Sequence, residues 1–426
     1  MSNGGRSRRV KPATPRHRES RGDVCLVDTR SAAHFNGWPE PGHTVGGHLP
    51  GAVHLDAAWA DGRDDAHLAT LLAERGVRRG ERVTLYGAEA QALADRMTSL
   101  GFANLEVTPD AMRTHVEGGF ETIASPHFER LLDPRRLDAL LQGQSMHRGP
   151  SRRPLVLEVG WRTMESYAQG HLPGAVYVDT EWLEEAPCWA RIPDDRLKAR
   201  LLSLGIAPTH PVVLYSANTL AAARVAHILS YAGVEDVRLL EGGKAAWLRA
   251  GYSLESGHAA PTAVHTWPGA FPRCPELFLD TVELKARLAD PDAQVLSVRS
   301  WSEFVGDTSG YLDIAARGHI PGAIWAYGGS DAYHLEDFRN PDETMRGGGE
   351  IAARWRACGI TPGRRTTFYC GTSWRASEVS FYASVMGWRR LSVYDGGWRA
   401  WTDAGENSVA LGASSGQRES SQRRWA

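Results

Sequence analysis

A pentapeptide of the pattern His-x-Pro-Gly-Ala occurs three times in the chain, at residues 48–52, 171–175 and 319–323. Each copy follows a short apolar run typical of a buried strand, at 24–30, 155–161 and 295–299. Each copy also precedes a helix-like stretch and a second strand-like run, at 83–86, 212–215 and 366–369. Because copies of one pattern must form the same structural unit, this repeat constrains the fold strongly. It predicts an α/β protein of three tandem units, each a parallel β-sheet with helices on both faces.

Glycine- and proline-rich stretches indicate where the units begin and end. Gly118, Gly119 and Pro126 separate unit one from unit two, and a Gly/Pro/Ala-rich stretch precedes unit three. We expect a disordered basic tail at 1–19, followed by unit one at 20–125 and unit two at 126–255. Unit three is expected at 256–408 with a connector at 256–276, and residues 409–426 are expected to be a second disordered tail.

The candidate for chemistry is the segment 366–378, in which a strand-like run ends at Cys370. A loop of small residues follows, and a helix is expected from Ser377 to Met386. In open α/β sheets, sites lie at the carboxyl ends of strands. The loop N–H groups and the helix N-terminus favour an anion at their centre. Cys370 is therefore predicted to be a nucleophilic thiolate rather than an ordinary buried cysteine.

The other two units carry different residues at the position of Cys370. Ser216 precedes Glu241-Gly242-Gly243 by the same number of residues that separates Cys370 from Asp395-Gly396-Gly397. Gly87 stands at the equivalent position of unit one. Features present in units without the cysteine are interpreted as structural. Features unique to unit three are candidates for the reaction.

This comparison assigns several suggestive residues to the structure. A histidine near a catalytic cysteine can be a general base. His48 and His171 occur where there is no thiol to activate, so His319 is predicted to be a turn and packing residue. Tyr369 has counterparts in the other units and is predicted to be a core residue. The Gly-Gly turns are predicted to support the loop.

Unit three alone contains the 371–375 loop and an insertion at 301–317, which includes Tyr311. The insertion is either a plain surface loop or a lid over the substrate. Arg375 lies near a helix start, where a cation is unfavourable against the helix dipole. It is either an exposed charge or a residue that binds an anion, and we favour anion binding.

The composition excludes some classes of function. With 42% hydrophobic and 23% charged residues and a net charge of −2, the 426-residue chain offers no electrostatic case for binding nucleic acid or an anionic membrane. It contains no apolar run long enough to span a bilayer and no signal-peptide pattern. The five cysteines show no CxxC pair and no metal-ligand spacing, which favours a reducing, cytoplasmic location.

The cysteine loop, the His-x-Pro-Gly-Ala turn and the Gly-Gly turn together resemble those of rhodanese-type sulfurtransferases, over about residues 20 to 408. The order and recurrence of the motifs resemble the bacterial members with three rhodanese domains. The chain departs from the family pattern at Ser373, where the loop commonly has glycine. It also departs at Ser297, where a strand ending Asp-x-Arg would have a carboxylate before Arg299.

The resemblance implies that Cys370 takes a sulfane sulfur from thiosulfate or 3-mercaptopyruvate as a persulfide and passes it to a thiol, cyanide or protein acceptor. The implied substrate-binding residues are Gly371, Thr372, Ser373, Trp374, Arg375, Arg299 and Tyr311. The resemblance implies no metal or organic cofactor.

Two other functions stay open at this point. Rhodanese-fold phosphatases use a related loop that is one residue longer between cysteine and arginine, which leaves room for phosphate. A sulfur carrier or protein-interaction scaffold without enzymatic activity is the alternative from a different class. Units one and two, which lack the cysteine, are expected to be of that kind.

Overall fold

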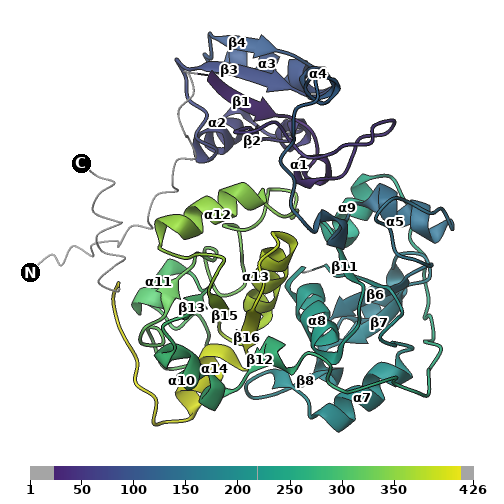
Figure 1. Cartoon of the computed structure of the whole chain (residues 1–426), viewed down its shortest axis with the longest axis vertical. Coiled ribbons are helices and arrows are strands. Elements are labelled where there is room, and N and C mark those ends of the chain that lie inside the picture. The colour runs from purple at the N-terminus through teal and green to yellow at the C-terminus, as the bar shows by residue number, and fades with distance from the viewer. Residues whose placement is uncertain (1–23, 218, 414–426) are drawn as a thin grey trace, which may run out of the picture.

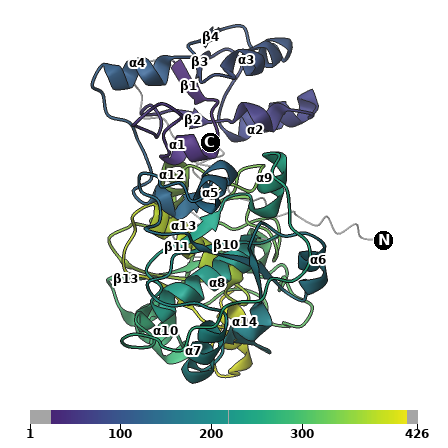
Figure 2. The same cartoon turned by 90° about the vertical axis from the view of Figure 1, so that its right-hand side faces the viewer.

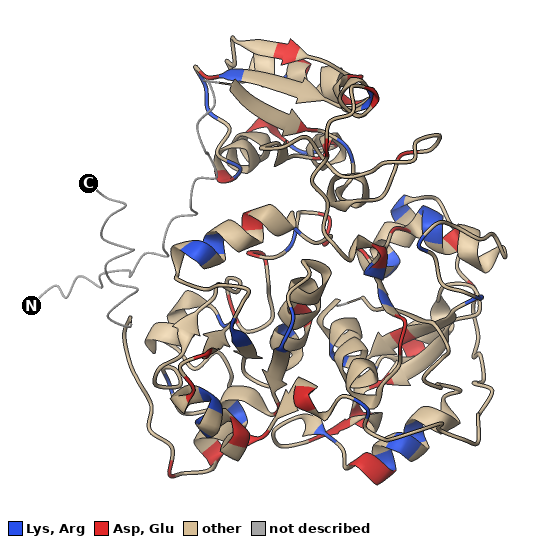
Figure 3. Ribbon diagram, in the orientation of Figure 1, with Lys and Arg blue, Asp and Glu red and all other residues tan. Residues whose placement is uncertain are grey.

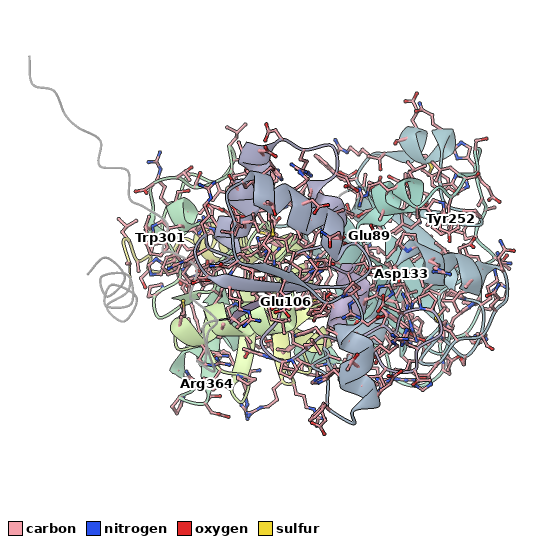
Figure 4. All side chains as sticks on the ribbon, turned by 90° about the horizontal axis from the view of Figure 1, so that it is seen from above. Glu89, Glu106, Asp133, Tyr252, Trp301 and Arg364 are labelled. Carbon is pink, nitrogen blue, oxygen red and sulfur yellow. The ribbon has the colours of Figure 1, made fainter. Side chains whose placement is uncertain are left out.

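The computed structural model describes residues 24–217 and 219–413. It contains three parallel β-sheets that follow one another along the chain, together with one short antiparallel pair. Unit one lies across the top of the other two units, which stand side by side (Figures 1 and 2). Seen from above, Glu106 of unit one lies between Trp301 of unit three and Tyr252 of unit two (Figure 4).

Unit one has a four-stranded parallel sheet in the order β2-β1-β3-β4. Its elements are β1 (Val24–Asp28), α1 (Ala32–Asn36), β2 (Val53–His54), a 3-10 helix η1 (Ala57–Ala60), α2 (Asp65–Glu74), β3 (Arg82–Tyr86), α3 (Ala90–Ser99), β4 (Leu105–Val107) and α4 (Ala111–Glu117). Side chains of α2 and α3 pack in one cluster with those of β1 and β3. Met112 of α4 packs in another cluster with Tyr86 of β3.

Unit two has a five-stranded parallel sheet in the order β5-β11-β10-β6-β7. Its elements are η2 (Phe128–Arg130), β5 (Leu131–Leu132), α5 (Pro134–Leu141), β6 (Leu155–Gly160), α6 (Met164–Gln169), β7 (Val176–Asp179), η3 (Thr180–Trp182), β8 (Glu184–Glu185), β9 (Ala190–Arg191), α7 (Asp194–Ser203), β10 (Val212–Tyr215), α8 (Thr219–Ala232), β11 (Val237–Leu240) and α9 (Gly243–Arg249). Strands β8 and β9 form the antiparallel hairpin.

Unit three repeats that topology in the order β12-β16-β15-β13-β14. Its elements are η4 (Pro275–Leu277), β12 (Phe278–Leu279), α10 (Thr281–Ala289), β13 (Ala293–Ser297), α11 (Trp301–Val305), β14 (Ile324–Trp325), α12 (Gly348–Ala357), β15 (Arg365–Tyr369), α13 (Trp374–Val385), β16 (Leu391–Tyr394) and α14 (Gly397–Asp403). Neighbouring residues on β15 face opposite sides, with Phe368 packed beside α12 and α13 and Tyr369 beside α10 and α14. The predicted class, parallel sheets with helices on both faces, is confirmed.

One hydrophobic cluster runs through units two and three without a break. Helices α8 and α13 pack against each other across the junction and lie side by side at the centre of Figure 1. The two helices that follow Ser216 and Cys370 therefore form the interface between the two units. Unit one contacts unit three through Arg75, the residue after α2, which donates to the Glu350 carboxylate and to Asn340 Oδ1, at 2.7 Å each.

The disordered C-terminal tail was predicted to begin at residue 409, which is too early. His319 and Ala410 form a backbone bridge, and Gly412 N donates to Val305 O at 2.9 Å. These bonds attach residues 409–413 to unit three, because the chain returns there to pair with the His-x-Pro-Gly-Ala segment. Equivalent bridges join His48 to Ile123 and His171 to Glu255. The predicted tail at 1–19 and the rest of the C-terminal tail lie outside the described residues.

Candidate active site

Cys370 is the first residue after β15 and lies at the carboxyl end of that strand. Its side chain is buried, with 1% of the residue exposed, and its thiol is not in a disulfide. Its position confirms the predicted strand–loop–helix arrangement. The predicted helix start is wrong, because α13 begins at Trp374, not at Ser377. The loop proper is therefore shorter than expected, and Trp374 and Arg375 belong to the first helical turn.

Backbone conformation explains how so short a loop turns. Ser373 precedes α13 in a left-handed conformation, with φ +78°, which a side chain makes costly and which glycine adopts freely. Its hydroxyl donates to Tyr394 O at 3.0 Å, which compensates part of that cost. Among the described residues, the N–H groups of 371–375 have no protein acceptor. A helix start leaves such donors available, so they can serve an anion bound at the sulfur.

The Gly-Gly turn supports the loop from the adjacent strand, as predicted. Trp398 N donates to Cys370 O at 2.8 Å, and Arg399 N donates to Gly371 O at 3.1 Å. A Cβ atom added at Gly397 would lie 2.7 Å from Cys370 O. A Cβ atom at Gly243 would lie 2.4 Å from Ser216 O in the same way. Ser216 therefore stands in unit two where Cys370 stands in unit three.

Arg375 is buried, with 1% exposed, so it is not the surface charge that was one of its two interpretations. Its guanidinium donates twice to the Glu303 carboxylate, at 2.8 and 2.9 Å. It also donates to Asp331 O at 2.9 Å. The charge at the helix start is thus offset by a carboxylate within unit three.

Glu303 was not identified from the sequence. It lies in α11, inside the unit-three insertion, and is fully buried. Burial by itself would raise its pKa, but the attraction of Arg375, followed by that of Arg299, outweighs burial and lowers the pKa to about 2. Glu303 therefore remains ionised. It supplies the carboxylate that the sequence lacks at Ser297.

Arg299 supports the site through contacts with protein atoms. Its three side-chain nitrogens donate to the Glu303 carboxylate at 3.1 Å, Gly318 O at 2.6 Å and Ser309 O at 2.9 Å. Its guanidinium also lies 4.8 Å from the centre of the Trp398 ring. These contacts fix the two ends of the insertion. They support a positioning role for Arg299, and its predicted role in binding substrate stays a prediction.

Tyr311 decides between the two interpretations of the insertion. A Cβ atom added at Gly371 would lie 2.1 to 2.2 Å from three atoms of the Tyr311 phenol, so the ring rests directly on the loop. Its hydroxyl accepts from Arg375 and donates to Ala332 O, at 3.3 and 3.4 Å. Burial raises the pKa of the Tyr311 hydroxyl. Among residue types, only glycine at position 371 leaves room for the ring. The insertion covers the loop at this residue.

Two further contributors were missed. The segment 328–334 supplies the carbonyl groups of Asp331 and Ala332 to Arg375 and Tyr311. Glu184 of unit two accepts a hydrogen bond from Trp374 Nε1 at 2.7 Å. Neither has a sequence signal, because carbonyl groups exist at every residue and Glu184 meets the loop only across the junction of two units.

The three histidines behave as predicted. Each places Nδ1 against a backbone carbonyl of the preceding helix, at 2.8 to 3.0 Å from O of Phe35, Tyr167 and Phe304. Each stacks on the aromatic ring of that same residue. The contacts are the same with and without a cysteine nearby, so His319 is a packing residue. The hydroxyl groups of Tyr86, Tyr215 and Tyr369 likewise accept backbone N–H groups in the core.

Among the described residues, no cluster of three or more His, Cys, Asp or Glu side chains is placed to hold a metal ion. No helix within that part of the chain is both long and apolar enough to span a membrane. Basic and acidic residues are interspersed over all three units (Figure 3).

The chain belongs to the rhodanese-type sulfurtransferases, whose fold and cysteine loop it shares. The family model for the rhodanese-like domain matches residues 151–250 and 280–404. The thiosulfate sulfurtransferase YnjE of Escherichia coli is 40% identical over 391 residues, covering 91% of this chain and 88% of that protein. The crystal structure of YnjE has a TM-score of 0.86 at 39% identity, covering 93% of this chain and 95% of that chain.

Two other similar proteins differ in the reactions their names describe. A Pseudomonas aeruginosa protein named a probable 3-mercaptopyruvate sulfurtransferase is 31% identical over 261 residues, covering 58% of this chain and 86% of that protein. A structure of EanB with a cysteine persulfide and ergothioneine has a TM-score of 0.88 at 34% identity, covering 92% of this chain and 96% of that chain. The chain is thus an enzyme of the sulfurtransferase class.

Proposed function

We propose that Cys370 is the nucleophile of this sulfurtransferase and carries the transferred sulfur as a persulfide. The observation that supports this most directly is the loop at the end of β15. There a buried cysteine precedes a helix start whose N–H groups have no protein acceptor among the described residues. Donors arranged in this way stabilise an anionic sulfur, both in the thiolate and in the persulfide.

The reaction is a double displacement. With thiosulfate, the Cys370 thiolate attacks the outer sulfur, the S–S bond breaks, and sulfite leaves with the electron pair. With 3-mercaptopyruvate, the thiolate attacks the thiol sulfur, the C–S bond breaks, and the pyruvate enolate takes a proton at carbon. An acceptor then attacks the outer persulfide sulfur and returns Cys370 to the thiolate.

The remaining loop residues have supporting roles in this proposal. The N–H groups of 371–375 hold the sulfur anion and the charged end of the donor. Arg375 places positive charge beside them, although Glu303 neutralises most of it. Tyr311 covers the loop and limits what can reach Cys370. Thr372 is half-buried in the loop and lines the space around the sulfur.

We further propose that all three units are rhodanese-like domains and that only the third is catalytic. Support comes from the parallel sheet of each unit and from the backbone bridges of His48, His171 and His319. The proposed domains are 20–125, 126–255 and a third that begins at 256 and extends to about Gly412. Gly87 and Ser216 offer no thiol, so units one and two are expected to position and cover unit three.

The acceptor has two candidates. A thiol, cyanide or protein acceptor is the expectation from the thiosulfate and mercaptopyruvate relatives. An imidazole carbon is the second candidate, because structures of EanB variants contain hercynine or ergothioneine. Those variants change a tyrosine and a threonine spaced from the EanB persulfide cysteine as Tyr311 and Thr372 are from Cys370. With an imidazole as acceptor, the ring carbon would attack the outer persulfide sulfur, so that a C–S bond replaces the ring C–H bond. The Cys370 thiolate leaves with the electron pair of the S–S bond, and the proton lost from carbon balances its charge.

The test separates sulfur loading from sulfur delivery. The full chain is incubated with thiosulfate or 3-mercaptopyruvate without acceptor, and its mass is measured intact and after digestion. One added sulfur on the peptide of Cys370 is the expected result, and sulfur on any other cysteine would refute the site. The loaded protein is then divided between cyanide and hercynine, and thiocyanate and ergothioneine are quantified. The faster product identifies the acceptor class.

A further inference from the structure

Unit two makes direct contact with the sulfur-binding loop of unit three. Trp374, in the first turn of α13, donates its indole N–H to Glu184 Oε1 at 2.7 Å. Glu184 lies on β8 of unit two and is buried, with 1% exposed. The hairpin β8–β9 therefore brings a carboxylate across the junction to the end of the loop that begins at Cys370.

A second contact starts from the same carboxylate. Arg224 of α8 donates from Nε to Glu184 Oε2 at 2.9 Å and from a terminal nitrogen to Asp395 Oδ1 at 2.8 Å. The other Asp395 oxygen accepts from Arg191 N of the hairpin at 3.1 Å. Asp395 opens the Gly-Gly turn, and the two residues that follow this turn, Trp398 and Arg399, donate their N–H groups to the carbonyls of Cys370 and Gly371. The network thus reaches the loop at two places, through Trp374 and through the turn that begins at Asp395.

We propose that Glu184, together with Arg224, is a positioning element for the sulfur-binding loop, so that unit two sets the geometry of the catalytic cysteine in unit three. This inference rests on the proposed function of Cys370. It gives unit two a defined role in the reaction, exerted through Trp374 and Asp395 rather than through contact with substrate.

The energetics of the network favour this role over simple adhesion. Burial raises the pKa of Glu184 to about 7, although Arg224 acts in the opposite direction. Burying a carboxylate is expensive, and well-packed apolar residues would hold two units together at least as well. An ion pair with defined hydrogen bonds also fixes the orientation of its partners. One oxygen of Glu184 orients the Trp374 indole and the other orients the Arg224 guanidinium. Small displacements of a catalytic loop are known to slow reactions strongly.

A matched control exists at another contact between units two and three. Glu241 of unit two is buried to a similar degree and accepts from Met345 N of unit three at 2.9 Å. It belongs to the Gly-Gly turn beside Ser216, so it also joins the two units. Within the described residues it makes no hydrogen bond or ion pair with the loop of Cys370. Its removal should weaken the interface without moving the loop.

The experiment compares Glu184→Ala, Glu184→Gln, Trp374→Phe, the Glu184→Ala/Trp374→Phe double variant and Glu241→Ala in the full chain. Three quantities are measured: the rate of sulfur loading from thiosulfate, the rate at which iodoacetamide alkylates Cys370 by peptide mapping, and Tm. Glu184→Ala and Trp374→Phe should each slow loading about ten- to hundredfold. Glu184→Gln should recover part of the rate, because its amide oxygen can still accept the indole N–H. The double variant should be no slower than the slower single variant.

Glu241→Ala should lower Tm while leaving loading and alkylation within about twofold of the wild type. Equal slowing by Glu184→Ala and Glu241→Ala at equal loss of Tm would overturn the inference, as would full additivity in the double variant.

If the wild type takes up no sulfur, the proposed function fails. In that case the alkylation rates test the positioning role. A changed alkylation rate of Cys370 in Glu184→Ala, together with an unchanged rate in Glu241→Ala, would still show that Glu184 positions the loop.

Discussion

Units two and three share one sheet topology and one backbone turn but differ in how charge is arranged at the end of the central strand. In unit two, Glu158 lies opposite Tyr215 on the neighbouring strand. Its carboxylate accepts from the Tyr215 hydroxyl at 2.5 Å and pairs with Lys244 at 2.5 Å. In unit three, Ser297 stands at the position of Glu158 and Trp398 at that of Lys244. The carboxylate comes instead from Glu303, which lies on the insertion and pairs with Arg375 in the first turn of α13.

One structural need is met in three different ways. The carbonyl of the glycine before each histidine accepts from a buried or half-buried cation: Gly47 from Arg30, Gly170 from Lys244 and Gly318 from Arg299, at 2.6 to 2.7 Å. A contact found in units without a cysteine is interpreted as structural, so the bond from Arg299 to Gly318 is assigned to the fold. The pair of Glu303 and Arg375 has no counterpart among the described contacts of unit two, and it marks where unit three has been adapted.

The sharpest test of the comparison exchanges the residues at the strand ends. Cys370→Ser should lower sulfur transfer by roughly a thousandfold or more with little change in Tm, because the thiolate is the nucleophile. Ser216→Cys in that background should restore nothing, since unit two lacks a counterpart of the Glu303–Arg375 pair. Transfer is measured as thiocyanate formed from thiosulfate and cyanide. Activity in the double variant would mean that the fold alone activates a cysteine.

The second test removes the displaced carboxylate. Glu303→Gln leaves Arg375 and Arg299 buried without their anion, and losing one partner of a buried pair costs about 3–5 kcal/mol. Sulfur loading should fall by about ten- to hundredfold. Glu158→Gln in unit two is the matched control and should lower Tm while leaving loading nearly unchanged. Equal loading in both variants would remove the distinction between the units.

The same variant has a defined pH dependence. The pKa of Glu303 is about 2 in the fold, against an ordinary value of 4.5, so the unfolded chain takes up the proton first as pH falls. The stabilisation by this group is therefore present above about pH 4.5 and is lost as pH falls towards 2. The difference in Tm between the wild type and Glu303→Gln should be largest at neutral pH and should shrink below pH 4.5. A difference independent of pH would show that the ion pair is not its source.

A smaller effect is expected from Tyr311, which covers the loop. Tyr311→Ala uncovers Gly371 and should speed alkylation of Cys370 by iodoacetamide by about three- to tenfold, while slowing sulfur loading to a similar degree. Leu312→Ala, at the exposed neighbouring residue, is the control and should change neither rate. Alkylation at the wild-type rate in Tyr311→Ala would show that the ring does not limit access to the thiol.

The smallest effect on activity is expected at the histidines. His319→Ala and His171→Ala each lose one hydrogen bond and one ring contact, worth about 1 kcal/mol of stability. Both should lower Tm by similar amounts and leave sulfur transfer per folded molecule unchanged. A selective loss of activity in His319→Ala would revive the general-base interpretation.

Much of this architecture could be read from the sequence because it depends on local patterns that recur. Strand-like runs, the His-x-Pro-Gly-Ala turn and the glycine pairs predicted the sheets, the equivalence of Ser216 and Cys370, and the packing role of His319. The start of α13 was missed because Ser373 adopts a left-handed conformation normally associated with glycine. The end of unit three was missed because Ala410 pairs with His319 through backbone atoms, which carry no side-chain signal.

The sequence by itself identified Cys370 as the proposed nucleophile, since only one of three equivalent strand ends has a thiol, and neighbouring residues in the chain create the loop around it. Only the tertiary structure decided which charges surround that thiol. The carboxylates of Glu303 and Glu184 approach the loop from distant parts of the chain, and Glu184 comes from another unit. Electrostatic partners depend on distance in space, whereas sequence patterns record only distance along the chain.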